Sequence, residues 1–533
     1  MIYDLAINNG IIIDGFSKKR FKGSIGINKS KIIEISNSPL EGRQIINADN
    51  LIVAPGFIDI HTHSETGFVL DNRMENKLLQ GVTTDIVGNC GISLFPKPKN
   101  RKYISDFKDY CSGLLVGMDM LSDEFDNTQE YLDFLLKNKI GINCGVLIGH
   151  GSLRICSMGF ENREPSKYEL NHMMKLLERE LEMGALGMSV GLIYPPGSYS
   201  NQFELIELSR VLEKYNAILT AHIRNEGSKV FDSVQEIINV SEITGVRAHI
   251  SHLKLLGPSQ WGNAEKLVNM IEDAQKRGIN ITADQYPYSA TSTMLSAVIP
   301  QIIQEGGMDI MLERLEESKF ETDMLSEIKM LINERGGAER IVIAYTHEMK
   351  PEYEGQSLYE LGRKLGITPE ETVIKILKEC HGKVNAVYHS ILNKDMNYIL
   401  GKRDIAIASD GFAFDFENKI GGGRPHPRSF GTFPRFLRLC RENEILPLEL
   451  AIQKITSIPA KVMKLKNIGE IRVNNYADIT ILSENEFSDK ATFANPFQRP
   501  VGLKYVIVSG KIAVKDGEIT SQRMGRVLAN YIS

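Results

Sequence analysis

The chain has 533 residues, of which 42% are hydrophobic and 24% charged, a composition typical of globular proteins. Its 62 basic and 67 acidic residues leave a net charge of −5, which disfavours a nucleic-acid partner because such proteins carry a basic face. The six cysteines are too widely spaced for a disulfide framework, and neither a secretory signal nor an apolar run of about 18 residues is present. We therefore expect a cytoplasmic protein of several domains with no membrane partner.

Short alternating or apolar runs, separated by Gly and Asn, predict β-strands at both ends of the chain. Near the N-terminus these runs cover residues 4–9, 11–14, 23–28 and 31–35. Near the C-terminus they cover residues 478–482, 505–509 and 511–514. The simplest arrangement joins residues 1–54 and 465–533 in one small β-sandwich domain beside the central region.

Between these ends, strand-like and helical segments alternate, which is typical of a parallel sheet with crossover helices. Capping-box sequences at residues 166–169 and 368–371 mark two of the helix starts. Eight apolar runs predict the strands of a (β/α)8, TIM-like barrel. They are residues 57–60, 83–87, 144–148, 186–190, 217–221, 247–251, 280–283 and 405–408, within a barrel domain of residues 55–464.

Two further apolar runs, residues 341–345 and 384–388, exceed the eight strands that a barrel needs. We interpret about residues 289–340 as an insertion into the barrel. Its helical, charged character predicts a cover over the barrel mouth.

Residue types that bind metals follow several of these predicted strands. His61 and His63 come directly after residues 57–60, and side chains at positions i and i+2 of a strand point the same way, so this pair can hold one metal ion. All strand ends of this kind meet at the C-terminal face of a barrel, where active sites lie. Four other strand ends supply further ligand types: Cys90, His222, His252 and Asp410. Imidazole, thiolate and carboxylate together suit Zn²⁺, so the sequence predicts a zinc site at this face.

Three other histidines have less specific surroundings. His249 lies three residues before His252 and so points to the opposite face of its strand, where we expect it to pack against the helical layer. His150 follows another predicted strand and could contact substrate or be structural. His426, between two prolines, is interpreted as a structural loop residue.

These residues lie in longer strings that resemble the N-acyl-D-amino-acid deacylase (D-aminoacylase) family of the amidohydrolase superfamily. The resemblance extends over nearly the whole chain and is carried by residues 54–63, 88–91, 187–197, 221–224, 251–254, 283–288 and 424–435. It implies hydrolysis of N-acyl-D-amino acids to a carboxylate and a free D-amino acid. The preference for the D-form rests on the resemblance alone.

The resemblance also implies how metal is held. Family members bind one zinc ion tightly through a cysteine and two histidines, which match Cys90, His222 and His252. A second, weaker metal position would use His61 and His63 with the same cysteine shared between the two metals.

By the same resemblance, Asp410 would lie over the metal and act as the proton shuttle. The substrate carboxylate would be bound by Lys254, Tyr288 and Ser292, with Tyr286 as an alternative to Tyr288. Two further candidate substrate contacts lie within the shared strings: Tyr194 and Arg224. Residues 388–390 (Tyr-His-Ser) depart from the family's pattern, and their role stays open.

Two alternative functions share this predicted fold. Cyclic-amide hydrolases, which act on hydantoins, dihydropyrimidines or dihydroorotate, bridge two metals with a carboxylated lysine on a mid-barrel strand. The run 186–190 contains no lysine, which disfavours that function. A non-catalytic assembly protein would have lost metal ligands, yet all six are present.

Overall fold

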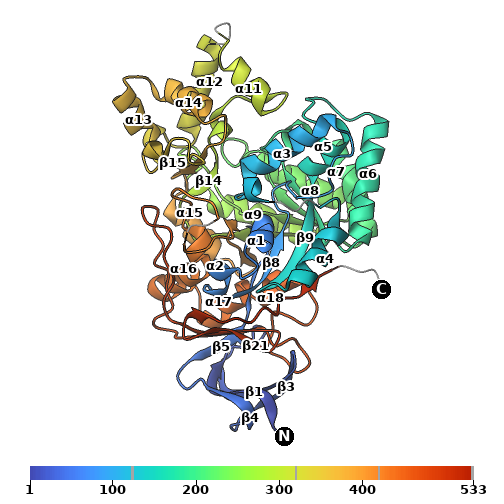
Figure 1. Ribbon diagram of the computed structural model, residues 1–533, viewed down its shortest axis with the longest axis vertical. Helices are drawn as coiled ribbons and strands as arrows, with labels where there is room; N and C mark the ends of the chain where they lie inside the picture. Colours follow the sequence, from blue (N-terminus) through green and yellow to red (C-terminus); the bar gives the residue numbers. More distant parts are fainter. Residues whose placement is uncertain (122–124, 318–320, 418–419, 530–533) are drawn as a thin grey trace.

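The computed structural model describes residues 1–121, 125–317, 321–417 and 420–529. Residues 318–320 of the predicted insertion and 530–533 of the predicted C-terminal segment lie outside this description. A β domain occupies one end of the molecule, a barrel the middle, and an inserted segment the opposite end (Figure 1). Within the residues described, no helix has both the length and the apolar character needed to cross a membrane.

Eight parallel strands form the barrel, which confirms the predicted fold. In order around the sheet they are β6 (Phe57–Asp59), β8 (Val82–Val87), β9 (Asn143–Gly149), β10 (Gly187–Gly191), β11 (Ile218–His222), β12 (Arg247–Ile250), β13 (Ile281–Gln285) and β17 (Ile405–Ile407). Nearly every residue of these strands is buried, as expected for a parallel sheet covered by helices.

The seam between the first and last barrel strands is closed just beyond the strands themselves. The Asp410 N–H donates to the His61 carbonyl at 2.8 Å, and the Ser409 N–H donates to the Asp59 carboxylate at 2.9 Å. Short strands β7 (Thr62–His63) and β18 (Gly411–Phe412) then pair in parallel. This seam brings the first and last predicted ligand segments together.

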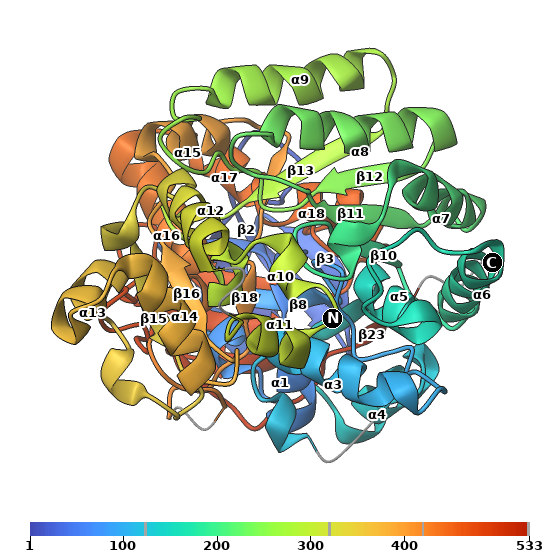
Figure 2. The ribbon, with the colours of Figure 1, turned by 90° about the horizontal axis from the view of Figure 1, so that it is seen from above.

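Amphipathic helices surround the barrel (Figure 2). Helix α6 begins at the predicted capping box, in which Ser166 and Glu169 each accept from the other's backbone N–H. The helices outside the insertion are α1 (Glu65–Leu70), α2 (Glu75–Leu78), α3 (Lys102–Leu114), α4 (Thr128–Asn138), α5 (His150–Met158), α6 (Lys167–Glu182), α7 (Gln202–Lys214), α8 (Val230–Thr244), α9 (Ala264–Lys276), α15 (Asn393–Leu400), α16 (Arg428–Asn443), α17 (Leu448–Lys454) and α18 (Ser457–Val462).

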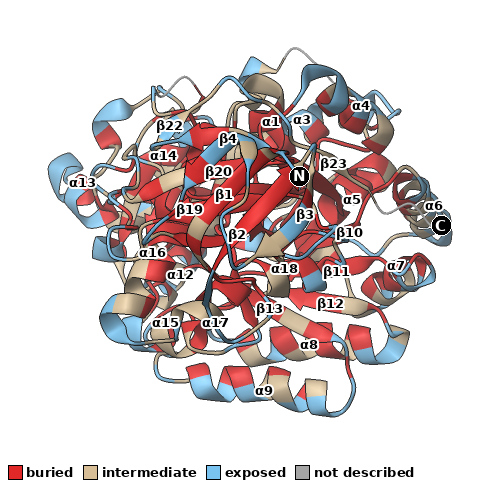
Figure 3. Ribbon diagram, turned by 90° about the horizontal axis from the view of Figure 1, so that it is seen from below, coloured by how far each residue is buried: buried red, intermediate tan, exposed pale blue. Residues whose placement is uncertain are grey.

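The two chain ends share one mixed sheet, which forms the small β domain predicted from both termini (Figure 3). Its strands are β1 (Tyr3–Ile12), β2 (Phe21–Asn28), β3 (Lys31–Ser36), β4 (Gly42–Asn47), β5 (Ile52–Pro55), β19 (Ile479–Leu482), β20 (Leu503–Val508), β21 (Lys511–Lys515) and β22 (Glu518–Ile519). The chain then leaves this domain, and β23 (Val527–Leu528) pairs with barrel strand β9. The C-terminal segment therefore does not lie wholly in the β domain.

The insertion extends beyond the predicted boundary at residue 340. Its elements are β14 (Thr291–Met294), α10 (Gln301–Gln304), α11 (Met308–Arg314), α12 (Glu321–Glu334), β15 (Ile341–Tyr345), α13 (Leu358–Leu365), α14 (Pro369–Glu379) and β16 (Asn385–Tyr388). The two extra apolar runs form a three-stranded antiparallel sheet with β14 rather than joining the barrel, and β16 is its central strand, between β14 and β15. This sheet and the helices share a separate hydrophobic core that runs from Leu295 to Tyr388. The segment is therefore a mixed α/β unit, not a purely helical one.

Candidate metal and substrate site

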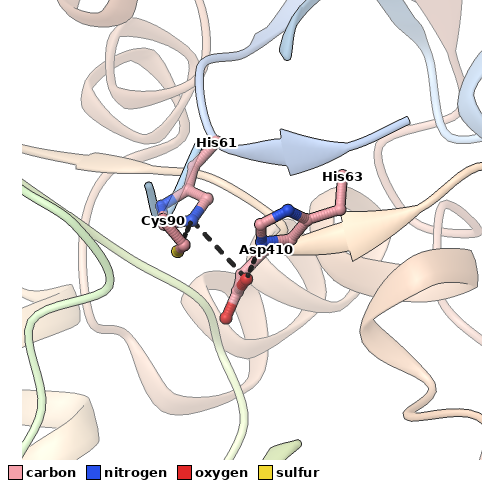
Figure 4. Close-up of side chains that lie close together, drawn as sticks. All are labelled: His61, His63, Cys90 and Asp410. Carbon is pink, nitrogen blue, oxygen red and sulfur yellow. Dashed lines mark hydrogen bonds and ion pairs between the residues drawn. The ribbon is translucent and has the colours of Figure 1, made fainter. Parts of the chain in front are cut away.

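The structure brings all six predicted metal ligands together at the C-terminal face of the barrel. They form two groups that share one residue: His61, His63, Cys90 and Asp410 (Figure 4), and Cys90, His222 and His252. Within each group the ligand atoms all lie within 4.8 Å of one another. The Cys90 thiol points between them, so it can serve two metal positions.

Backbone geometry at the strand ends aims these side chains inward. Cys90, His252 and Asp410 all have positive φ angles, of 53°, 39° and 51°. For residues other than glycine this left-handed conformation is unfavourable by about 1–2 kcal/mol, and it persists where the surrounding structure imposes it, often at functional sites. Each of these residues lies two or three residues after the end of a barrel strand, so the strain is placed at the turn that directs a ligand into the site.

The donor atoms lie close to the spacing that a tetrahedral zinc ion requires. Zn–N distances near 2.0–2.1 Å and a Zn–S distance near 2.3 Å imply donor–donor separations of roughly 3.3–3.7 Å. Cys90 Sγ lies 3.6 Å from His252 Nε2 and 3.2 Å from His61 Nε2. His222 Nδ1 lies 2.9 Å from His252 Nε2, somewhat closer than that range. The donor set and its spacing therefore fit zinc.

The ionisation of the cysteine also suits a metal ligand. Burial alone would raise the pKa of the Cys90 thiol. The charge of His61 and hydrogen bonds from His222 and His252 outweigh it, and the pKa falls well below its usual range. The thiolate is the form that binds metal.

Asp410 is held as a carboxylate by its neighbours. Burial would raise its pKa, but Arg428 foremost, followed by His252 and His61, lowers it well below the usual range. Arg428 Nη1 lies 2.8 Å from Asp410 Oδ2, whereas Oδ1 lies 3.2 Å from His63 Nε2. One oxygen is therefore anchored and the other faces the metal ligands.

A buried aspartate orients two of the histidines from behind. Asp284 on β13 accepts from the backbone N–H of His252 at 2.8 Å, and its other oxygen lies 3.4 Å from His61 Nδ1. That oxygen also lies 2.8 Å from His249 Nε2. His249 therefore does more than pack against the helical layer, because it holds the carboxylate that positions the ligands.

Glu226 is a site residue that the sequence did not single out. It lies four residues after His222 and is buried, with its carboxylate bonded to the Lys254 ammonium and 3.2 Å from His252 Nδ1. Burial would raise its pKa, but Lys254 first, and His222 and His252 next, hold it well below the usual range. Lys254 Nζ also lies 2.7 Å from His252 Nδ1, so the predicted substrate lysine already belongs to a buried ion pair beside the metal ligands.

The two candidate tyrosines point in different directions. An i→i+2 hydrogen bond from the Tyr288 N–H to the Tyr286 carbonyl turns the chain between them. Tyr288 donates its hydroxyl to the Pro427 carbonyl and is buried against His426. The centre of the Tyr286 ring lies 5.0 Å from the Arg428 guanidinium and 5.7 Å from the Lys254 ammonium. The buried Tyr286 hydroxyl has no hydrogen-bond partner among the described residues. This geometry favours Tyr286 over the predicted Tyr288.

The other predicted substrate contacts divide into two groups. Ser292 and Tyr194 line the cavity over the metal ligands, and the Tyr194 hydroxyl is 2.9 Å from Thr293 Oγ1. Arg224 lies outside that cavity, paired with Glu236 at 2.9 Å and donating to the Ser198 and Ser200 carbonyls. These contacts favour a structural role for Arg224 over the predicted substrate contact.

Sequence comparison identifies the family. A model described as "Amidohydrolase family" matches residues 44–514. The chain belongs to the amidohydrolase family. It is 32% identical to an N-acyl-D-glutamate deacylase of Alcaligenes xylosoxydans xylosoxydans, over 98% of this chain and 96% of that one, and 29% identical to a D-aminoacylase of the same organism, over 99% and 98%.

Solved structures agree with this assignment. The crystal structure of an N-acyl-D-glutamate deacylase from Bordetella bronchiseptica, complexed with zinc and a phosphonate inhibitor, has a TM-score of 0.81 and 28% identity, and 99% of this chain matches 100% of that one. A D-hydantoinase reaches a TM-score of only 0.55 at 14% identity, a likeness that shows the fold alone. Strand β10 of this amidohydrolase contains no lysine that could bridge two metals.

The remaining predicted histidines support this amidohydrolase site from behind or lie away from it. His426 Nδ1 accepts from the Arg428 N–H at 3.0 Å, while Nε2 lies 3.0 Å from the Ala290 carbonyl. His426 thereby helps to hold the arginine that anchors Asp410. His150 is buried, with Nε2 2.7 Å from Glu204 Oε1, and it does not line the cavity. Of its two possible roles, this placement favours the structural one.

Proposed function

We propose that this amidohydrolase hydrolyses N-acyl-D-amino acids to a carboxylate and a free D-amino acid, with zinc as its cofactor. The observation that carries the proposal is that two groups of possible metal ligands share Cys90. One of these groups contains the ionised Asp410, which Arg428 holds in place. Relatives named N-acyl-D-glutamate deacylase, D-aminoacylase and N-acyl-D-aspartate deacylase each align with nearly the whole chain.

Five residues would bind metal. Cys90, His222 and His252 would hold the tight zinc ion, and His61 and His63 a weaker one. Zinc bound there would acidify a water molecule and polarise the amide carbonyl. The description of one D-aminoacylase structure likewise refers to a binuclear metal centre.

Asp410 moves the proton. Its Oδ1, which faces the metal ligands, accepts a proton from water and delivers it to the departing amide nitrogen, while Arg428 keeps Oδ2 in place. Lys254, Tyr286 and Ser292 would bind the carboxylate on the carbon next to that nitrogen. The six cysteines are all free and buried, which supports a cytoplasmic location.

A substrate panel with the purified zinc protein tests the function. N-acetyl-D-amino acids should be hydrolysed, their L-enantiomers much more slowly, and hydantoin and dihydroorotate not at all. Turnover of the cyclic amides, or of none of these compounds, would overturn the proposal in favour of the cyclic-amide hydrolase or the assembly protein respectively.

A further inference from the structure

One buried arginine in the cavity wall lacks the carboxylate that the other buried arginines have. Three arginines are buried among the described residues: Arg154, Arg335 and Arg428. Arg154 pairs with Glu204 and Arg428 with Asp410. Arg335, only 9% exposed, forms no ion pair within the part of the chain that the structure describes. A buried charge without a partner is costly, so such a group points to a ligand that completes it.

The contacts of Arg335 leave part of its guanidinium available. Nη2 donates to the Ala297 carbonyl at 3.2 Å, and the group lies 4.7 Å from the centre of the Tyr388 ring. Nε and Nη1 have no hydrogen-bond partner in the described part of the protein. The carboxylate next in the chain, Glu334, accepts from the Ser228 hydroxyl instead. Two donors in a fixed planar fork therefore remain for a ligand.

Arg335 borders the cavity that contains the metal ligands. It lines this cavity together with Cys90, His222, His252 and Asp410, and it also lines the adjoining cavity between barrel and insertion. The other charged groups of the metal-site cavity are already paired, Asp410 with Arg428 and Glu226 with Lys254. The insertion thus adds one uncompensated positive charge to the substrate cavity.

We propose that Arg335 binds the side-chain carboxylate of the substrate and so selects N-acyl-D-amino acids with acidic side chains. This inference rests on the proposed function. In the proposed function Lys254, Tyr286 and Ser292 bind the substrate carboxylate next to the scissile nitrogen. Arg335 would therefore bind a second anionic group, on the substrate side chain. The other arginine of this wall, Arg428, is already paired with Asp410. Much of the remaining wall is apolar: Ile92, Leu114, Val116, Met294, Phe412 and Phe414.

Acidic and neutral substrates of equal size give the direct test. The unaltered enzyme should have a kcat/KM for N-acetyl-D-glutamate or N-acetyl-D-aspartate about 10- to 100-fold above that for the corresponding glutamine or asparagine compound, as one charged hydrogen-bonded contact provides. Arg335→Met should remove this preference by raising KM for the acidic substrates, with kcat little changed, because the contact is the same before and during reaction. Neutral substrates should be hydrolysed as before.

Two further variants and a binding measurement separate recognition from structure. Arg335→Lys keeps the charge and should retain part of the preference. Arg340→Met removes an exposed arginine of the same insertion, which donates to the His389 carbonyl, and should leave the preference intact. The product D-glutamate should inhibit more strongly than D-glutamine, and Arg335→Met should abolish the difference. Zinc content and melting temperature show that each variant is folded.

Three results would overturn the inference. The first is an unaltered enzyme that hydrolyses acidic and neutral substrates equally well, which leaves the proposed function standing and decides the matter even if Arg335→Met fails to fold. The second is an equal loss on both classes in Arg335→Met, which would make Arg335 a ligand of the common carboxylate or a structural tether. The third is absence of hydrolysis of any N-acyl-D-amino acid, which would remove the proposed function as well.

Discussion

The two walls of the substrate cavity are built in different ways. On the barrel side, each chemical group lies at or just beyond the C-terminal end of a parallel strand, as His222 ends β11 and Asp410 lies three residues after β17. On the insertion side, Ser292 lies on β14, Asn385 begins β16, and Arg335 follows helix α12. In the proposed function the barrel would supply the metal ligands and the proton shuttle, whereas the insertion would supply substrate contacts whose chemistry can vary without changing those ligands.

Charge pairing follows the same division. On the barrel side of the cavity, the buried charges beside the metal ligands are matched, Asp410 with Arg428 and Glu226 with Lys254. On the insertion side, Arg335 remains unmatched within the described residues. Since matched pairs fix ligand geometry and an unmatched charge requires a ligand, we expect barrel substitutions to affect metal and kcat, and insertion substitutions to affect KM and substrate choice.

The largest effect is expected from removal of the shared ligand. Cys90→Ala takes one donor from both metal groups, so the tightly held zinc and with it the turnover should be lost. Elemental analysis and activity on the same sample measure this. Cys380→Ala is the matched control, because Cys380 is equally buried but lies in the core of the insertion. Full zinc content and full activity in Cys90→Ala would show that the ligand assignment is wrong.

Asp410→Asn should give the next largest loss. The substitution keeps the size of the side chain and removes the proton acceptor, so kcat should fall by about 100- to 10,000-fold with little change in KM. Zinc at Cys90, His222 and His252 should remain. Asp273→Asn, on the exposed face of α9, controls for the loss of one carboxylate. Loss of zinc in Asp410→Asn would recast this residue chiefly as a ligand.

How far the sequence predicts the molecule depends on which wall is considered. The barrel strands are buried on both faces and therefore appear as continuous apolar runs, and the ligands follow these runs directly. The six metal-ligand candidates could thus be named by their place after a strand. Glu226 could not, because an acidic residue in the Asn-Glu-Gly loop after His222 has the same pattern as a solvated turn.

For the two candidate tyrosines and for the insertion, the local sequence pattern does not determine the structure. The chain turns at Pro287, between Tyr286 and Tyr288. The alternation of side chains along a strand therefore does not predict which of the two tyrosines faces the site. The runs 341–345 and 384–388 have the composition of barrel strands, and only their pairing with each other and of 384–388 with β14 assigns them to the insertion. Arg335 follows helix α12 and lines the cavity, a position that no spacing in the sequence reveals.

A smaller but still substantial effect is expected at the buried Lys254–Glu226 pair. Lys254→Met leaves Glu226 buried without its cation, which should destabilise the fold by about 3–5 kcal/mol and raise KM. Denaturant unfolding and steady-state kinetics measure the two effects. The double variant Lys254→Met/Glu226→Gln should recover stability without recovering KM, because the substrate contact stays absent. Normal KM in the stable double variant would remove Lys254 from substrate binding.

The smallest effects should come from helix caps, and they test whether barrel and insertion are separate packing units. Thr368 caps α14 in the insertion and Ser166 caps α6 on the barrel, each through a capping box and each exposed. Replacing either by Ala should cost about 0.5–2 kcal/mol of local stability. Because Val373, Ile376 and Leu377 belong to the insertion's own core, Thr368→Ala should increase hydrogen exchange in α14 and its insertion neighbours while α6 stays protected. Ser166→Ala should do the reverse. Neither variant should change zinc content, and increased exchange in both regions from a single cap would mean that the two walls of the cavity unfold as one unit.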